Sequence, residues 1–132
     1  MSSKKTILIA DDSPTMRAML VSAIESIGDY RIVEASSGFE ALRLLPREKV
    51  DLILTDINMP DINGLELISY LRNNSNYLTI PVIIISTEGS QKDIDKGRLL
   101  GANEYLVKPI DHTRLQALIS SYLCISPRVE NS

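Results

Sequence analysis

The sequence has no tryptophan, one phenylalanine, one histidine and one cysteine in 132 residues. The single cysteine, Cys124, excludes an intrachain disulfide framework and a cysteine-rich metal site. The single histidine, His112, argues against histidine-based zinc chemistry. Because aromatic residues make up only 5% of the chain, the core has to be built mainly from Leu, Ile and Val. That composition is typical of a buried parallel sheet covered by helices.

The sequence also lacks a basic excess and a long apolar run. Its formal net charge is −3, whereas a general nucleic-acid binder carries a basic patch. No apolar stretch approaches the roughly 18 residues of a membrane span, and the polar start, residues 1–5, lacks the apolar core of a signal peptide. We therefore predict a small cytoplasmic domain that has neither nucleic acid nor a membrane as a partner.

Short apolar runs alternate along the chain with segments of helical periodicity. The runs predict five strands, at 6–10, 31–35, 52–55, 81–85 and 105–107. A helix is predicted after each strand, and capping signals mark several starts, such as Ser13 before Pro14 and the segment 37–40, which has the form of a capping box. Gly28 and Gly101 are predicted to end the helices that precede them.

This alternation predicts an α/β fold in which a strand–helix unit occurs five times. Such an order gives a parallel sheet covered by helices on both faces, with right-handed crossovers. We expect one domain over residues 1–125, a frayed tail over 126–132 and no output domain. A doubly wound sheet binds its ligand outside the carboxyl ends of the strands, so a site is expected at that edge.

Polar residues follow four of the five predicted strands at that edge: Asp11 and Asp12 after the first, Asp56 after the third, Ser86 and Thr87 after the fourth, and Lys108 after the fifth. Taken singly, each has an ordinary explanation as a turn or helix-capping residue. Taken together, three carboxylates at one edge repel one another unless a cation lies among them, and Mg²⁺ prefers such oxygen ligands. Mg²⁺, an ammonium group and a hydroxyl would together bind a phosphoryl group, and a central aspartate is a nucleophile able to form an acyl phosphate.

This set of motifs resembles the receiver domain of response regulators in two-component signalling, and most of all the single-domain regulators of chemotaxis. The resemblance extends from Lys5 to about Tyr122. It rests on Asp11-Asp12, the segment 56–60 with Gly64, Ser86, and the segment 105–109. It implies a flavodoxin-like fold, with a five-stranded parallel sheet in the order 2-1-3-4-5.

The resemblance also implies the chemistry of the acidic residues. Asp56 would be the phosphoacceptor. Mg²⁺ would be the cofactor, bound by the carboxylates of Asp12 and Asp56, by the backbone carbonyl of Asn58, and by Asp11 either directly or through a water molecule.

Four further residues have roles implied by the resemblance. Ser86 would be the switch hydroxyl that donates to the phosphoryl group; it is preferred to Thr87 because its spacing from Lys108 fits the family. Lys108 would pair with the phosphoryl oxygens, beside a cis bond to Pro109. Tyr105, expected as a half-buried residue of the edge strand, would move with Ser86. The rate at which the phosphoryl group is lost would be tuned by Asn58, Thr87 and Glu88.

These roles imply a phosphorylation-activated signalling switch rather than an enzyme. A sensor histidine kinase, or a small acyl-phosphate donor, would phosphorylate Asp56, and autodephosphorylation or a phosphatase would reverse the step. The face made by the fourth helix, fifth strand and fifth helix, about 91–100 and 105–115, would bind an output protein such as one of the flagellar motor. The chain is expected to be monomeric. A phosphorelay intermediate and a stand-alone regulator of another process stay open.

Three functions of other classes fit the residues less well. A Mg²⁺-dependent aspartyl phosphohydrolase usually needs a second aspartate two residues after the nucleophile as general acid and base, where this chain has Asn58. A flavodoxin-like electron carrier would need a Ser/Thr-rich phosphate loop after the first strand, where this chain has Asp11 and Asp12. A scaffold that is never phosphorylated is disfavoured because every position of the site is filled.

Overall fold

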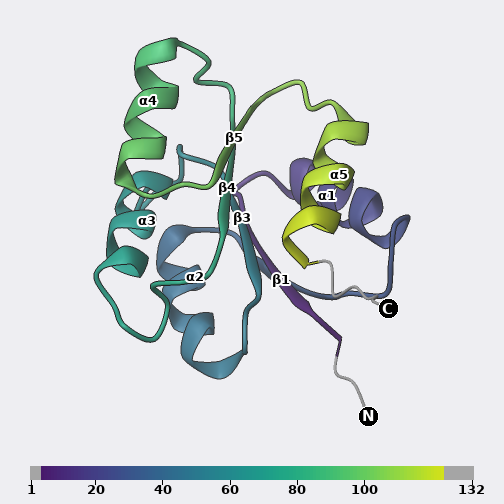
Figure 1. Ribbon diagram of the computed structural model, residues 1–132. Coiled ribbons are helices and arrows are strands. Elements are labelled where there is room, and N and C mark those ends of the chain that lie inside the picture. The colour runs from purple at the N-terminus through teal and green to yellow at the C-terminus, as the bar shows by residue number, and fades with distance from the viewer. Residues whose placement is uncertain (1–3, 124–132) are drawn as a thin grey trace, which may run out of the picture.

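The computed structural model describes residues 4–123, so Cys124 and the expected tail at 126–132 lie outside the described residues. Strands and α-helices alternate along the chain (Figure 1). The strands are β1 (Thr6–Ala10), β2 (Arg31–Ala35), β3 (Leu52–Thr55), β4 (Val82–Ser86) and β5 (Glu104–Val107). The helices are α1 (Pro14–Glu25), α2 (Gly38–Leu44), α3 (Gly64–Arg72), α4 (Gln91–Leu100) and α5 (His112–Leu123), with a short 3-10 turn, η1 (Leu45–Arg47), after α2.

The strands form one parallel sheet in the order β2-β1-β3-β4-β5. The resemblance led us to expect this order, and the structure confirms it. Ala10 at the end of β1 pairs with Thr55 at the end of β3, and Ser86 at the end of β4 pairs with Val107 at the end of β5. The carboxyl ends of these four strands therefore lie along one edge of the sheet.

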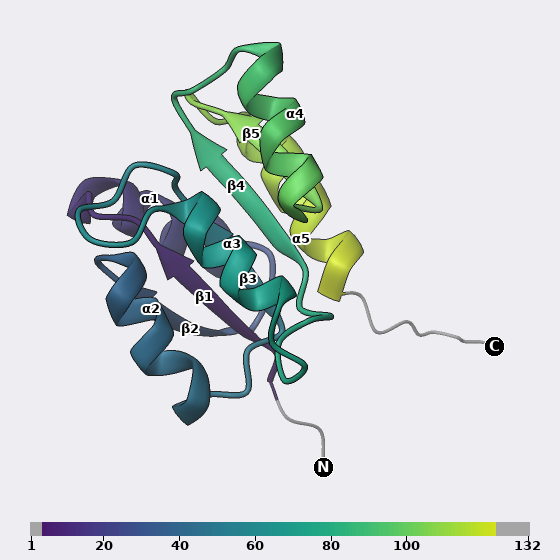
Figure 2. The same ribbon diagram turned by 90° about the vertical axis from the view of Figure 1, so that its left-hand side faces the viewer.

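Two layers of helices enclose the sheet (Figures 1 and 2). Helices α1 and α5 cover one face, and α2, α3 and α4 cover the other. Alternate residues of β1 serve the two layers, with Leu8 in the core on the α2 and α3 side and Ile7 and Ile9 in the core on the α1 and α5 side. Because β1 is buried on both faces, it reads in the sequence as an unbroken apolar run. Within residues 4–123, no helix has the length and apolar character needed to cross a membrane.

Several of the predicted helix boundaries are confirmed. The Ser13 hydroxyl accepts a hydrogen bond from the N–H of Met16 at 3.2 Å, as an N-cap should. In addition to these predicted signals, Asn63 and Glu66 form a reciprocal capping box at the start of α3. Gly101 ends α4 with a φ of 123°.

Of the other predicted capping signals, the one at Gly28 is wrong and the one at 37–40 is confirmed only in part. Helix α1 ends at Glu25, where Ser26 caps it, and Gly28 has no positive φ. In the segment 37–40 the Ser37 hydroxyl does accept from the N–H of Glu40. The Glu40 carboxylate, however, accepts from the N–H of Ser36 at 2.6 Å, so the reciprocal half of the box is absent there.

Candidate functional site

Asp11 and Asp56 lie next to each other at the carboxyl edge of the sheet because β1 and β3 are adjacent strands. The N–H of Asp56 donates to the carbonyl of Ala10 at 2.9 Å, which continues the pairing of these strands by one residue. Both aspartates are buried, with 2% of Asp11 and 8% of Asp56 exposed, whereas Asp12 is exposed. Each of the three offers a carboxylate oxygen within 4.8 Å of the others. The structure thus brings together the three acids selected from the sequence.

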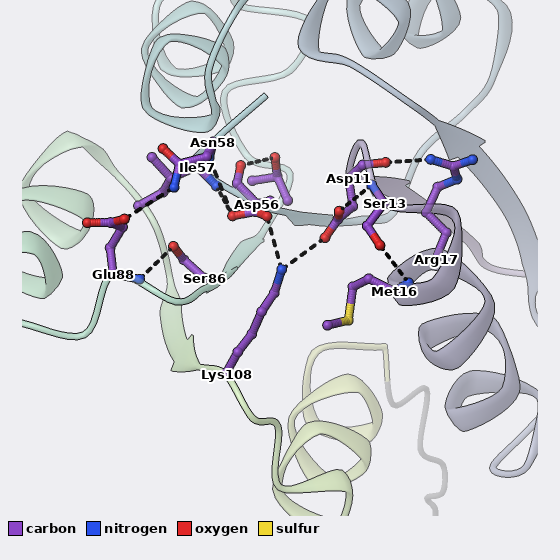
Figure 3. A network of polar contacts seen from close by, with 11 residues as sticks. Asp11, Ser13, Met16, Arg17, Asp56, Ile57, Asn58, Ser86, Glu88 and Lys108 are labelled. Carbon is purple, nitrogen blue, oxygen red and sulfur yellow. Dashed lines mark hydrogen bonds and ion pairs between the residues drawn. The ribbon is translucent and has the colours of Figure 1, made fainter. Parts of the chain in front are cut away.

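Lys108 reaches this acidic cluster from the residue after β5 (Figure 3). Its Nζ lies 3.0 Å from Oδ2 of Asp56 and 3.3 Å from Oδ2 of Asp11. The peptide bond from Lys108 to Pro109 is cis, as the resemblance implies. One ammonium group therefore bridges two buried carboxylates, and the third carboxylate stands beside them.

Burial and pairing act in opposite directions on the charges of this cluster. Burial raises the pKa of Asp11, although the N–H of Ser13 and the Lys108 ammonium act against that rise. Burial by itself would lower the pKa of Lys108, but the hydrogen bond to Asp56 and the charges of Asp56 and Asp11 outweigh it and raise that pKa. Lys108 is consequently held in its charged form.

The backbone after β3 fixes the orientation of the Asp56 side chain. Its Oδ1 accepts a hydrogen bond from the N–H of Ile57 at 2.6 Å, which leaves Oδ2 directed at Lys108. The chain returns at Gly64, whose N–H donates to the carbonyl of Ile57 at 2.9 Å. A Cβ at Gly64 would lie 2.1 Å from the carbonyl oxygen of Asp56, so only glycine fits this close approach.

The acidic cluster fits a Mg²⁺ ion by the chemistry of its donors. Three carboxylates converge against a single ammonium group, and hard oxygen ligands in this number suit Mg²⁺. The residues that would hold the ion are Asp11, Asp12 and Asp56, with the backbone carbonyl of Asn58 as the expected fourth donor.

Ser86 lies at the end of β4, which is shifted by one residue from the predicted strand at 81–85. The shift arises because the N–H of Lys108 donates to the carbonyl of Ser86 at 2.8 Å and extends the pairing with β5. The Ser86 side chain is fully buried, and its hydroxyl accepts from the N–H of Glu88 at 3.0 Å. Thr87 is exposed. Of these two residues, Ser86 is therefore the one whose hydroxyl is enclosed by the fold.

Tyr105 is more deeply buried than expected for an edge-strand residue. Only 6% of it is exposed, and its hydroxyl donates to the carbonyl of Glu88. Burial raises the pKa of the phenol. The Tyr105 ring therefore lies inward in the structure, beside the loop that leads into α4.

Asn58 and Glu88 meet above the site from two different loops. The Asn58 side-chain amide donates to the Glu88 carboxylate at 3.2 Å, so the loop after β3 is joined to the loop after β4 (Figure 3). Both side chains are exposed. This contact therefore lies at the surface of the molecule.

Arg17 was missed in the sequence analysis. It lies in the first turns of α1, and its Nη1 donates to the carbonyl of Asp11 at 2.6 Å while its Nε pairs with Glu34 at 3.1 Å. Arg17 therefore ties the backbone of an acidic residue to α1 and β2. A basic residue near the N-terminus of a helix opposes the helix dipole, and that mismatch was the available signal.

Comparisons with known proteins agree with this geometry. The model of one protein family, described as the response regulator receiver domain, matches residues 7–120. A chemotaxis protein CheY homolog from Campylobacter jejuni is 38% identical over 104 residues, which are 78% of this chain and 80% of the relative. Protein PilH from Pseudomonas aeruginosa is 37% identical over 117 residues, 89% of this chain and 96% of the relative. The solved structure of chemotaxis protein CheY4 from Vibrio cholerae superposes with a TM-score of 0.83 at 30% identity, covering 92% of this chain and 100% of that one.

Proposed function

The chain belongs to the response regulator receiver domain family, and from this premise we propose that Asp56 is the phosphoacceptor of its phosphorylation-activated switch. One observation carries the assignment: the Lys108 ammonium lies 3.0 Å from Asp56 and 3.3 Å from Asp11 at the carboxyl edge of the sheet. A carboxylate held this way is a nucleophile with a cation already beside it. We propose residues 1–125 as the receiver domain.

The proposed reaction transfers one phosphoryl group. A carboxylate oxygen of Asp56 attacks phosphorus, the bond from phosphorus to the donor's histidine nitrogen or acyl oxygen breaks, and the donor leaves with that electron pair. Lys108 then pairs with the phosphoryl oxygens, whose charge is spread over three atoms. In reversal, water attacks phosphorus, the bond to the Asp56 oxygen breaks, and inorganic phosphate leaves.

Bound Mg²⁺ would neutralise charge on the carboxylates and on the phosphoryl oxygens. The chain's own contribution is the fixed arrangement of the acceptor. Ile57 holds one oxygen of Asp56 by its N–H, and Lys108 faces the other. Because these groups are in place beforehand, little reorganisation is required when charge develops.

Incubation with acetyl phosphate and Mg²⁺ tests the proposed function. Intact-mass measurement should show one phosphoryl group per chain, and reductive trapping followed by peptide mapping should place it on Asp56. Removal of Mg²⁺ with a chelator should suppress the labelling, because the acidic cluster would then repel the incoming phosphoryl group. An unlabelled chain, or a label on another residue, would contradict the assignment.

The output of the switch is proposed to pass through Ser86. When Asp56 carries a phosphoryl group, the Ser86 hydroxyl would turn to donate a charge-assisted hydrogen bond to it and would leave the N–H of Glu88. The carbonyl of Glu88 in turn accepts from Tyr105, so the movement would be passed to the loop before α4. Ser86→Ala should keep phosphorylation by acetyl phosphate but lose the associated change in the α4–β5–α5 face, as amide chemical shifts would report.

The lifetime of the phosphorylated form is proposed to depend on Asn58, Thr87 and Glu88. Asn58 and Glu88 are polar groups joined over the site, and a polar path favours the attacking water. Thr87 is exposed beside that path, and its bulk is proposed to hinder the water and small donors. Thr87→Ala should therefore raise the rates of both phosphorylation and dephosphorylation in stopped-flow measurements. A fall in both rates would contradict the steric reading and favour Thr87 as the switch hydroxyl.

The proposed partners follow from the relatives. A sensor histidine kinase would be the donor, and a protein of a chemotaxis or motility system, with the flagellar motor as one case, would bind the α4–β5–α5 face in the cytoplasm. The support is the similarity to the chemotaxis proteins of Campylobacter jejuni and Vibrio cholerae. A motility defect in cells lacking the chain would agree with this; normal motility would favour a regulator of another process. A phosphatase partner, autodephosphorylation and the monomeric state stay predictions.

A further inference from the structure

Helix α4 contains a glycine in its interior, where glycine lowers the stability of a helix. Gly97 stands in the second half of a ten-residue helix and is its one buried residue in the described chain. Glycine in a helix interior destabilises the helix by about 1 kcal/mol relative to alanine. Its φ is not in the left-handed region, so backbone conformation gives no reason for it there. The reason has to lie in what Gly97 faces.

Gly97 faces the place where Ile84 of β4 and Tyr105 of β5 meet. A Cβ at Gly97 would lie 2.8 Å from Cδ1 of Ile84 and 3.2 and 3.3 Å from Cδ2 and Cε2 of the Tyr105 ring. Contacts this short require the neighbours to move. The absence of a side chain at position 97 therefore provides the room in which the Tyr105 ring lies.

The Tyr105 ring occupies that room in the inward position. Only 6% of Tyr105 is exposed, and its hydroxyl donates a hydrogen bond to the carbonyl of Glu88 in the loop that leads into α4. The ring is thus enclosed between β4, α4 and that loop.

We propose that Gly97 is a positioning residue of the switch: it leaves room for the Tyr105 ring to lie inward and thereby favours the active form of the chain. The inference rests on the proposed function and adds to it that the inward ring accompanies the phosphorylated state. A bias of this kind is a shift of populations between two conformations. By reciprocity, whatever favours the inward ring also favours binding of a phosphoryl group or its mimic at Asp56.

Substitution Gly97→Ala tests the proposal because alanine would strengthen α4 as a helix while displacing the ring. Protein labelled with 3-fluorotyrosine gives a ¹⁹F signal for Tyr105, which the Tyr105→Phe variant identifies. In Gly97→Ala this signal should move toward the position of an exposed tyrosine. The concentration of beryllofluoride, a phosphoryl mimic, needed for half-saturation in the presence of Mg²⁺ should rise about fivefold or more.

Two comparisons separate positioning from ordinary packing. Asp95→Ala, on the exposed side of α4, improves helix propensity without approaching the ring, and it should leave both the Tyr105 signal and the beryllofluoride midpoint unchanged. In a Tyr105→Leu background the ring is gone, so adding Gly97→Ala should no longer change the midpoint. A change of the same size in both backgrounds would overturn the proposal.

The remaining outcomes are also decisive. If Ile84 alone gives way to the new methyl group, Gly97→Ala will resemble the parent chain in both measurements, and the inference about Gly97 is overturned while the proposed function stands. If the parent chain itself fails to respond to beryllofluoride, the proposed function is overturned and this inference with it.

Discussion

Asp56→Asn is expected to abolish phosphorylation by acetyl phosphate while the fold is retained. The substitution keeps the size of the side chain, and its carbonyl oxygen can still accept from the N–H of Ile57, as Oδ1 of Asp56 does at 2.6 Å. The amide, however, is no longer a carboxylate nucleophile and cannot form an acyl phosphate. Intact-mass measurement should find no phosphoryl group, and the far-ultraviolet circular dichroism spectrum should match that of the parent chain.

Asp61→Asn is the matched control for this experiment. Asp61 lies on the same loop, is exposed, and accepts from the N–H of Ile62 at 2.6 Å in the way that Asp56 accepts from Ile57. It has no contact with Lys108, whose ion pairs within the described chain are with Asp11 and Asp56. Asp61→Asn should therefore be labelled as fully as the parent. Equal labelling of Asp56→Asn and the parent would remove Asp56 from its proposed role.

Gly64→Ala is expected to lower the stability of the fold strongly. The new Cβ would lie 2.1 Å from the carbonyl oxygen of Asp56, and two backbone segments would have to separate. Forcing atoms into a filled space of this kind costs about 3 kcal/mol, which corresponds to a fall of roughly 10 °C in the thermal midpoint. Because the displaced atom belongs to the phosphoacceptor itself, the rate of labelling by acetyl phosphate should fall as well.

Gly28→Ala serves as the control for Gly64→Ala. A Cβ at Gly28 would also be close to another group, but that group is the edge of the Tyr30 ring at 2.8 Å, on a partly exposed side chain rather than on the backbone. Its thermal midpoint should stay near that of the parent chain, with a change of about 1 kcal/mol or less. A midpoint for Gly64→Ala as high as that of Gly28→Ala would contradict the close approach at Gly64.

The sheet edge was predictable from the sequence because it depends on local patterns. Unbroken apolar runs marked the buried strands, and the rule that ligands bind at the carboxyl ends placed Asp11, Asp56 and Lys108 together. The strand order did not follow from the apolar pattern, because that pattern is the same in any order of buried strands; it came from the resemblance. The ion pair from Lys108 to Asp11 was not predicted, since Lys108 was expected to pair with the phosphoryl oxygens.

Features that depend on how the side chains of two different elements pack against each other were not predictable from the sequence. The inward position of Tyr105 and the room left by Gly97 arise where α4 packs on β4 and β5, and no spacing along the chain records that contact. The one-residue shift of β4 to include Ser86 has the same origin, since it depends on pairing with β5. In the sequence, Ser86 simply follows an apolar run.

The central claim is that occupation of Asp56 is transmitted to the α4–β5–α5 face, and amide chemical shifts recorded with and without beryllofluoride and Mg²⁺ test it most directly. The account predicts changes at Asp56 and Lys108, at the Glu88 amide as it loses the Ser86 oxygen, and onward through Tyr105 and along α4. Changes confined to the residues around Asp56, with Glu88, Tyr105 and α4 unaffected, would contradict it.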